Sequence, residues 1–145
     1  MTTMNRMMMA AAVLAAPVLA LAARAEADAA PPPTVHEVKM VMEGTTARFE
    51  PAALTVRPGD RVRFVTVSGG PHNVAFDADR INDAAEGPLG AGMPGEKMGP
   101  LAGPLVIQSG QSWTMSFAGV PAGRYEYFCM PHAGMDMKGV ITVQG

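Results

Sequence analysis

The sequence predicts an all-β fold, an antiparallel β-sandwich of seven or eight short strands with one short helix. Short segments that alternate apolar and polar residues recur along the chain, and turn-forming Gly and Pro residues separate them. Only one short stretch has apolar residues at helical spacing, and no internal repeat is present. A chain of 145 residues is long enough for one domain with its own core, but not for two.

The beginning of the chain has the pattern of an export signal, and residues 1–25 are assigned to a signal peptide. Arg6 supplies the positive charge, Met7–Ala23 is uncharged and apolar, and Ala23-Arg24-Ala25 offers a small-x-small cleavage site. Ala20-Leu21-Ala22 is a second candidate site. We therefore expect a periplasmic or otherwise exported protein with no membrane span in the mature chain. An uncleaved anchor remains the alternative, because the apolar run approaches the length of a membrane span.

Residues 26–34 are rich in Ala, Asp and Pro and are expected to form a flexible leader before a folded domain at 35–145. Removal of the signal peptide takes away Arg6 and Arg24, so 9 basic residues remain against 13 acidic ones, a net charge of −4. This balance, with no cluster of Lys or Arg, excludes a nucleic-acid-binding protein. It weakly favours a basic protein partner.

The first strands are expected on both sides of a proline break. Val35–Glu43 alternates loosely and ends at Gly44, whereas Phe49 and Leu54–Val56 flank Pro51. After a Pro58-Gly59-Asp60 turn, Arg61–Val67 alternates charged with apolar residues in the manner of a half-buried strand.

Two less regular stretches follow the next turn. Ser68–Pro71 ends the preceding strand, and Asn73–Phe76 is a short strand that begins beside His72. Asp77–Glu86 is expected to form one or two helical turns, with Asp79 as a possible cap. The next 18 residues, 87–104, contain six glycines and four prolines and are predicted to be a loop.

Strands resume in the last third of the chain, at residues 105–107, 112–117, 123–129 and 140–143. The expected core draws on one face of each strand, and its predicted members are Val62, Phe64, Val74, Phe76, Leu105, Ile107, Trp113, Met115, Phe117, Tyr125, Ile141 and Val143.

The segment Tyr127–Met137 gathers residues that bind soft metals. It holds the only cysteine of the chain, one of three histidines and three of thirteen methionines. A single cysteine cannot form an internal disulfide, so Cys129 is a buried hydrophobe, a reactive thiol or a metal ligand. A thiolate, an imidazole and a thioether close together favour copper over magnesium or calcium.

The spacing of these residues suits a mononuclear copper site, which takes two imidazoles, one thiolate and a weak axial thioether. Cys129 ends a predicted strand, His132 follows three residues later, and Met137 precedes the next strand. The second imidazole has to come from elsewhere. His72 fits, since it lies between a Gly-Gly-Pro turn and a strand.

These segments resemble the cupredoxins, in particular their plastocyanin/pseudoazurin-like branch. The resemblance rests on Cys129–His132 with Met137–Val143, on Pro71–Asp77, and on Phe49-x-Pro51 with Pro58–Phe64, and it extends over residues 35–145. It implies an eight-stranded Greek-key sandwich with one type 1 blue copper that alternates between Cu(II) and Cu(I). Residues 35–145 are accordingly expected to be a cupredoxin copper-binding domain.

The resemblance implies that His72, Cys129, His132 and Met137 are the metal ligands. It also implies that Asn73 ties the two ligand segments together by hydrogen bonds, a contact that tunes a metal site. Met135 is the alternative axial ligand, because amicyanin-like loops are two residues shorter. The alternation of Gly139–Val143 keeps register with the longer loop and favours Met137.

The function implied is one-electron shuttling between larger redox proteins, without enzymatic activity. Electrons would pass through the edge of the His132 ring, and Pro131, Ala133 and Gly134, with Met130 and Met135, would form the partner contact. A cytochrome c, a photosystem, an oxidase or a reductase are the expected classes of transient partner for a monomeric carrier. The exposed acids of residues 77–86 either steer a basic partner or form an ordinary solvated face.

The main alternative is a periplasmic copper chaperone or storage protein that uses the thioethers of Met93, Met98, Met130 and Met135. A metal-free binding sandwich would leave the ligand spacing to coincidence, and zinc sites do not use thioethers. A multicopper oxidase needs more histidines than the three present, and a binuclear copper centre needs two cysteines. His36 has no partner motif and is expected to be solvated.

Overall fold

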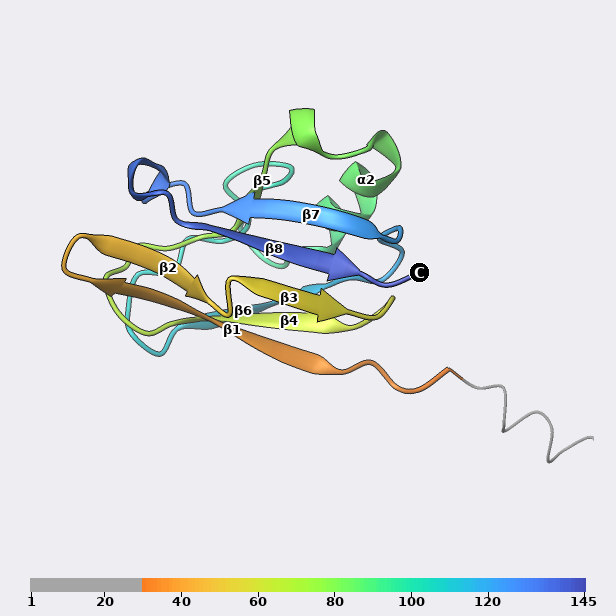
Figure 1. The fold of residues 1–145 in the computed structure, drawn as a ribbon, viewed down its shortest axis with the longest axis horizontal. Coiled ribbons are helices and arrows are strands. Elements are labelled where there is room, and N and C mark those ends of the chain that lie inside the picture. The colour runs from red at the N-terminus through yellow and green to blue at the C-terminus, as the bar shows by residue number, and fades with distance from the viewer. Residues whose placement is uncertain (1–29) are drawn as a thin grey trace, which may run out of the picture. The chain divides into compact units, whose positions relative to one another are not determined.

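Two four-stranded β-sheets pack face to face in the computed structural model, which describes residues 30–145 (Figure 1). The predicted signal peptide and residues 26–29 of the predicted leader lie outside the described residues. Both assignments therefore stay predictions. Residues 30–34 are exposed and have no regular secondary structure.

The eight strands confirm the predicted all-β sandwich. The first sheet has the order β2-β1-β4-β6, formed by β1 (Val35–Glu43), β2 (Thr46–Glu50), β4 (Arg61–Thr66) and β6 (Ser112–Ser116). The second has the order β3-β8-β7-β5, formed by β3 (Ala53–Val56), β5 (Ala75–Phe76), β7 (Gly123–Phe128) and β8 (Lys138–Val143).

Each sheet contains one parallel pair, so the expectation of a purely antiparallel sandwich is wrong in this detail. β1 runs parallel to β4, with Val35 beside Arg61, and β3 runs parallel to β8, with Ala53 beside Val140. The chain leaves the first sheet after β2, forms β3 in the second, and returns at β4. Such crossovers between sheets bring strands together in the same direction.

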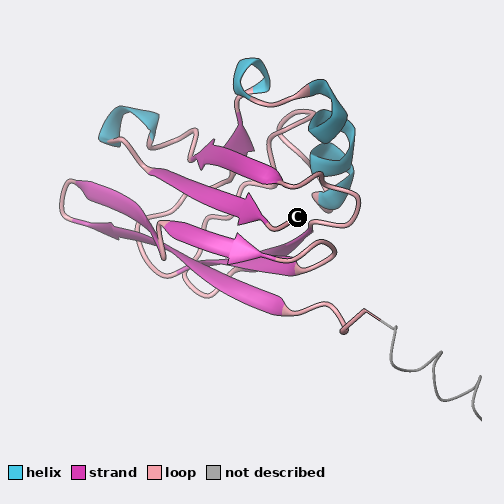
Figure 2. Cartoon of the chain, turned by 45° about the vertical axis from the view of Figure 1, so that its right-hand side comes forward, coloured by secondary structure: helices cyan, strands magenta, loops and turns pink. Residues whose placement is uncertain are grey.

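A ten-residue helix, α2 (Asp83–Gly92), follows a 3₁₀ turn, η1 (Ala78–Arg80), and lies at the opposite end of β7 from the Cys129 loop (Figures 1 and 2). Its cap is Asn82, whose side-chain oxygen accepts from the Ala85 N–H at 2.9 Å, and not Asp79. Within the described residues, no helix is both long and apolar enough to cross a bilayer.

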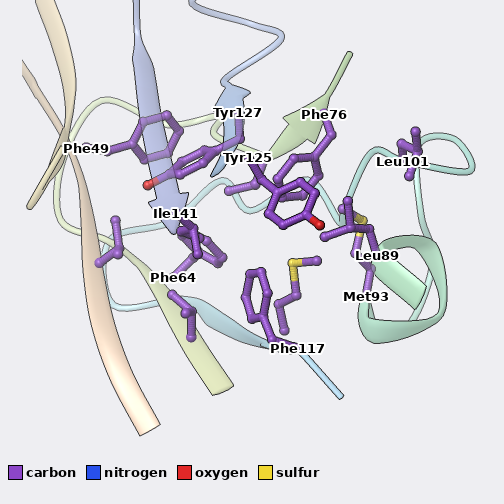
Figure 3. Packing of buried hydrophobic residues seen from close by; sticks show 14 of the residues in the cluster. Phe49, Phe64, Phe76, Leu89, Met93, Leu101, Phe117, Tyr125, Tyr127 and Ile141 are labelled. Carbon is purple, nitrogen blue, oxygen red and sulfur yellow. The ribbon is translucent and has the colours of Figure 1, made fainter. Parts of the chain in front are cut away.

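The helix extends six residues into the stretch that the glycines and prolines predicted to be a loop. Packing explains the difference. Leu89 and Met93 are buried against the core (Figure 3), and a Cβ at Gly92 would lie 2.0 Å from the carbonyl oxygen of Ser116. Glycine is used here for close approach to strand β6, and burial of Leu89 overrides the low helix propensity.

The strand and core predictions at residues 105–107 are wrong. Leu105 and Ile107 are 39% and 62% exposed, whereas Val106 between them is buried. The backbone of Val106 exchanges hydrogen bonds of 2.8 and 2.9 Å with that of His72 in an isolated bridge. This bridge sets which side chain faces inward. The other ten predicted core residues are buried.

Tyr127 on β7 is the centre of an aromatic cluster between the sheets (Figure 3). Its ring centroid lies 4.7 Å from that of Phe49, 5.7 Å from Phe64 and 6.1 Å from Phe76, mostly in edge-on arrangements that aromatic rings favour. The hydroxyl is buried without a hydrogen-bond partner, and burial raises the pKa of Tyr127 far above its usual value. The ring therefore stays neutral.

His36 is not solvated as expected but binds Asp60. Its Nε2 lies 2.9 Å from Asp60 Oδ2, while the buried Asp60 carboxylate also accepts from the backbone N–H groups of Thr34 at 2.8 Å and Arg57 at 3.0 Å. These bonds hold the pKa of Asp60 far below its usual range, with the His36 contact the largest cause. The carboxylate thereby fastens the start of β1 to the turn before β4.

We expect Gly139→Ala to destabilise the copper-free protein by about 1–3 kcal/mol, because an added Cβ overpacks a filled core. Gly139 faces Tyr127 across β7 and β8, and the Cβ would lie 2.4 Å from the ring carbon Cζ. Gly134→Ala is the matched control, since nothing lies within 4 Å of its added Cβ. Urea unfolding gives the free energy of unfolding of both variants. Equal stabilities of the two variants would contradict this account of Gly139.

Acid should weaken the fold partly through Asp60. Because its pKa is lower in the folded protein, its stabilising effect is complete above the unfolded-state pKa, about 3.9, and is lost as the pH falls toward the folded-state value. The free energy of unfolding should therefore decline less steeply below about pH 4 in Asp60→Asn than in the wild-type protein. Parallel pH profiles of the two proteins would exclude a role for this carboxylate.

Candidate metal centre

Cys129 lies directly after β7, where strand alternation carries it into the core. Tyr125 and Tyr127 of β7 are buried, and Cys129 continues the same period of two. Its backbone N–H donates to the carbonyl oxygen of Met137 at 3.0 Å, which closes the loop toward β8. The thiol is free and fully buried.

His72 is held by its backbone and by its ring. Beyond the bridge to Val106, its Nε2 lies 2.7 Å from the backbone carbonyl oxygen of Ser68. A carbonyl can only accept, so Nε2 carries the proton and Nδ1 keeps its lone pair. Ser68 is itself fixed, because its Oγ pairs with the backbone N–H and carbonyl of Met42. The free nitrogen of His72 is thus presented to Cys129, with Nδ1 3.8 Å from Sγ.

His132 approaches the same sulfur from the following turn, η2 (Ala133–Met135), whose N-cap it is. Its Nδ1 lies 3.5 Å from Cys129 Sγ, and its backbone N–H donates to the Cys129 carbonyl at 3.3 Å. The rings of His72 and His132 are 4.8 Å apart between centroids. His132 is 8% exposed, whereas His72 and Cys129 are fully buried.

The distances from the Cys129 sulfur to the two imidazole nitrogens suit a trigonal metal ion. The ligand atoms of the three side chains all lie within 4.8 Å of one another. With metal bonds of about 2.3 Å to sulfur and about 2.0 Å to nitrogen, in-plane ligands at 120° would have sulfur and nitrogen about 3.7 Å apart. The observed distances of 3.8 and 3.5 Å bracket this value. One thiolate with two imidazoles is the donor set of a blue-copper plane.

Burial favours the neutral forms of Cys129 and His132. It raises the pKa of the Cys129 thiol, and the backbone N–H groups of Asn73 and His132 oppose this only in part. Burial, followed by the neighbouring His72, lowers the pKa of the His132 imidazole. A metal ion must therefore displace the thiol proton but finds the His132 nitrogen already deprotonated near neutral pH.

The two candidate axial methionines differ in burial. Met137 is fully buried, immediately before β8, and Met135 in η2 is 40% exposed. The Met137 carbonyl is bonded to Cys129, so the residue borders the site through its backbone as well. Burial therefore favours Met137.

Asn73 joins the two ligand segments, as the resemblance implies. Its side chain is fully buried and its Oδ1 accepts from the backbone N–H of Met130 at 2.9 Å. Asn73 follows His72 and Met130 follows Cys129, so one hydrogen bond connects the segments that carry them. Hydrogen bonds from residues next to the ligands orient the ligands of a metal site.

The residues on either side of His132 in the chain, from Met130 to Met135, are uncharged. The residues predicted to contact a partner, Pro131, Ala133 and Gly134, are all exposed, as are Met130 and Met135. This loop stands at the end of the sandwich remote from α2 (Figure 1). The acidic residues Asp77, Asp79, Asp83 and Glu86 are exposed on η1, α2 and the residues next to them.

Sequence reasoning missed two contacts next to the site, one made by Ser68 and one made by Met98, which it had named only as a possible copper thioether. Ser68 supplies a backbone carbonyl, for which no side-chain pattern gives a signal. Met98 lies with its Sδ 3.6 Å from the Asn73 Nδ2, and its only signal was a methionine within a segment unusually rich in glycine and proline.

Similar proteins share this site region. A family model described as copper binding proteins, plastocyanin/azurin family, matches residues 36–144. A plastocyanin of Nostoc punctiforme is 37% identical over 111 residues, which cover 76% of this chain and 74% of the relative.

Solved structures of copper-protein families are similar to this fold. The oxidized plastocyanin of Dryopteris crassirhizoma matches with a TM-score of 0.59 and 27% identity, covering 74% of this chain and 99% of that one. A pseudoazurin of Methylobacterium extorquens matches with a TM-score of 0.51 and 25% identity, covering 76% and 75%. Both likenesses cover about three quarters of this chain.

Proposed function

The chain belongs to the plastocyanin/azurin family of copper-binding proteins, and on this premise we propose that it carries single electrons between larger redox proteins through one type 1 copper site. The proposed ligands are His72, Cys129, His132 and Met137. The observation that carries the proposal is the spacing of Cys129 Sγ from the two imidazole nitrogens, 3.8 and 3.5 Å. A bound copper ion supplies a Cu(II)/Cu(I) couple at this place.

Contacts within the protein hold the proposed ligands in place, which suits fast electron transfer. The ring of His72 is fixed by Ser68, the strand register fixes Cys129, and the loop is fastened by the Cys129–Met137 backbone bond. A ligand cage that barely moves requires little reorganisation when its charge changes by one. Burial of the ligands also keeps water from the site.

His132 is the proposed point of electron entry and exit. It is the one proposed ligand with residual exposure, and uncharged residues of the 130–135 segment surround it. We expect Pro131, Ala133 and Gly134 to form the partner contact. A small uncharged contact favours weak and transient complexes, from which a carrier is released quickly.

The proposed partners are redox proteins such as a cytochrome c, a photosystem, an oxidase or a reductase, and the carrier acts as an exported or periplasmic monomer without enzymatic activity. The predicted signal peptide supports export. The exposed carboxylates of residues 77–86 either attract a basic partner or form an ordinary solvated face.

A copper chaperone or store is less well supported. The proposed ligand atoms belong to residues that are at most 8% exposed, which opposes the ligand exchange that metal hand-over requires. Met98, Met130 and Met135 are exposed thioethers, whereas Met137, the proposed axial ligand, is fully buried beside the site.

Addition of one equivalent of Cu(II) to the copper-free protein tests the function. We expect an intense blue absorption band and a narrow copper hyperfine splitting, since a buried thiolate would share electron density with the metal. Cys129→Ala should abolish the band. A colourless copper complex, or a blue one that survives this substitution, would rule out the proposed site.

The axial assignment has its own test in Met137→Leu, with Met135→Leu as the matched control. Loss of a thioether donor disfavours the oxidised ion, so Met137→Leu should raise the reduction potential. We expect at least a tenfold change in the oxidised-to-reduced ratio, equivalent to about 59 mV for one electron. Met135→Leu should leave the potential unchanged. The reverse outcome would make Met135 the axial ligand.

A further inference from the structure

The side chain of Asn73 has two partners, and only one of them belongs to the ligand loop. Its Oδ1 accepts from the Met130 N–H at 2.9 Å, and its Nδ2 lies 3.6 Å from the Sδ of Met98. The Met130 N–H can only donate, so the amide oxygen must face it. The NH₂ group is therefore directed at the methionine sulfur, which is a weak acceptor.

Backbone hydrogen bonds hold the segment that carries Met98 in place. Its backbone N–H donates to the carbonyl of Ala102 at 3.0 Å, and Ala102 in turn donates to Gly99 at 3.2 Å. Phe76 fastens the same turn to β5 by donating to the carbonyl of Leu101 at 2.9 Å. The segment after α2 is thus tied to the strand that follows His72 and Asn73.

The surroundings of Met98 are apolar and open. Its side chain is 52% exposed and shares a groove of about 330 Å³ with Phe128 and Met130, the residues on either side of Cys129. Asn73 below it is fully buried. A buried amide group without a hydrogen-bond partner costs free energy. The Asn73 NH₂ group therefore needs an acceptor, and the Met98 sulfur is the one that lies within reach.

We propose that Met98 is a positioning residue for the copper site. Its thioether accepts a hydrogen bond from Asn73 Nδ2, which holds the amide in the orientation that binds Met130 and keeps the His72 and Cys129 segments in register. The inference rests on the proposed copper function for its effect on the metal. The contact itself involves protein atoms alone.

Three variants separate the effect of the Met98 hydrogen bond from the effect of its side-chain shape. Met98→Leu keeps an apolar side chain of similar size and removes the acceptor. Met98→Gln keeps the length and offers a stronger acceptor to the same NH₂ group. Met135→Leu is the control for loss of an exposed methionine elsewhere, since Met135 is 40% exposed and has no hydrogen bond from Asn73. Thermal melts should first establish that all three are folded.

Amide hydrogen exchange of the copper-free proteins gives the first readout. In Met98→Leu the Met130 N–H should exchange roughly two- to tenfold faster than in the wild type, the range expected for weakening of one hydrogen bond. Met98→Gln and Met135→Leu should retain wild-type protection at this amide. Wild-type protection in Met98→Leu would overturn the proposal, as would equal loss in the Gln variant.

The reduction potential of the copper-loaded proteins gives the second readout. Met98→Leu should shift the potential, and Met98→Gln should restore it toward the wild-type value. Identical potentials in the wild type and Met98→Leu would overturn the role of Met98 at the metal. A wild-type chain that bound no copper would instead overturn the proposed function, and the exchange measurement would still decide whether Met98 positions Asn73.

Discussion

The alternation of β7 is the constraint on which the site depends. A strand exposes its side chains to opposite faces in turn, so the burial of Tyr125 and Tyr127 also commits Cys129 to the interior. The aromatic cluster around Tyr127 stabilises this register, because a shift by one residue would expose the tyrosines and the thiol together. Core packing and metal binding therefore rest on the same strand.

The other ligands are brought to this buried thiol from two directions. His132 arrives from the loop that joins β7 to β8, and His72 arrives beside β5, the neighbour of β7 in the sheet. The Ser68 carbonyl accepts from His72 and fixes its ring, and the Asn73 side chain accepts from the Met130 N–H and so joins the His72 segment to the Cys129 segment. All of these contacts are between protein atoms, so the protein itself maintains the geometry, as an electron carrier requires and a metal donor does not.

Local patterns predicted the strands well where one face is buried, as in residues 61–67 and 123–129. They failed where a distant contact decided the outcome. Val106 faces inward because it pairs with His72, and α2 continues through glycines because Leu89 is buried and Gly92 approaches β6. The two parallel strand pairs likewise depend on how the chain crosses between sheets, which a period of two does not reveal.

The sequence by itself determined the chemistry of the candidate site, because Cys129, His132 and Met137 are soft donors at close spacing on one loop and His72 begins a second matching segment. The tertiary structure alone decided how those donors are presented. The proton on His72 is placed by a carbonyl of Ser68, Met137 is buried while Met135 is exposed, and Asn73 meets Met98. Some of these contacts join residues that are distant along the chain, and others are made by backbone atoms. Neither kind of contact produces a recognisable pattern in the amino-acid sequence.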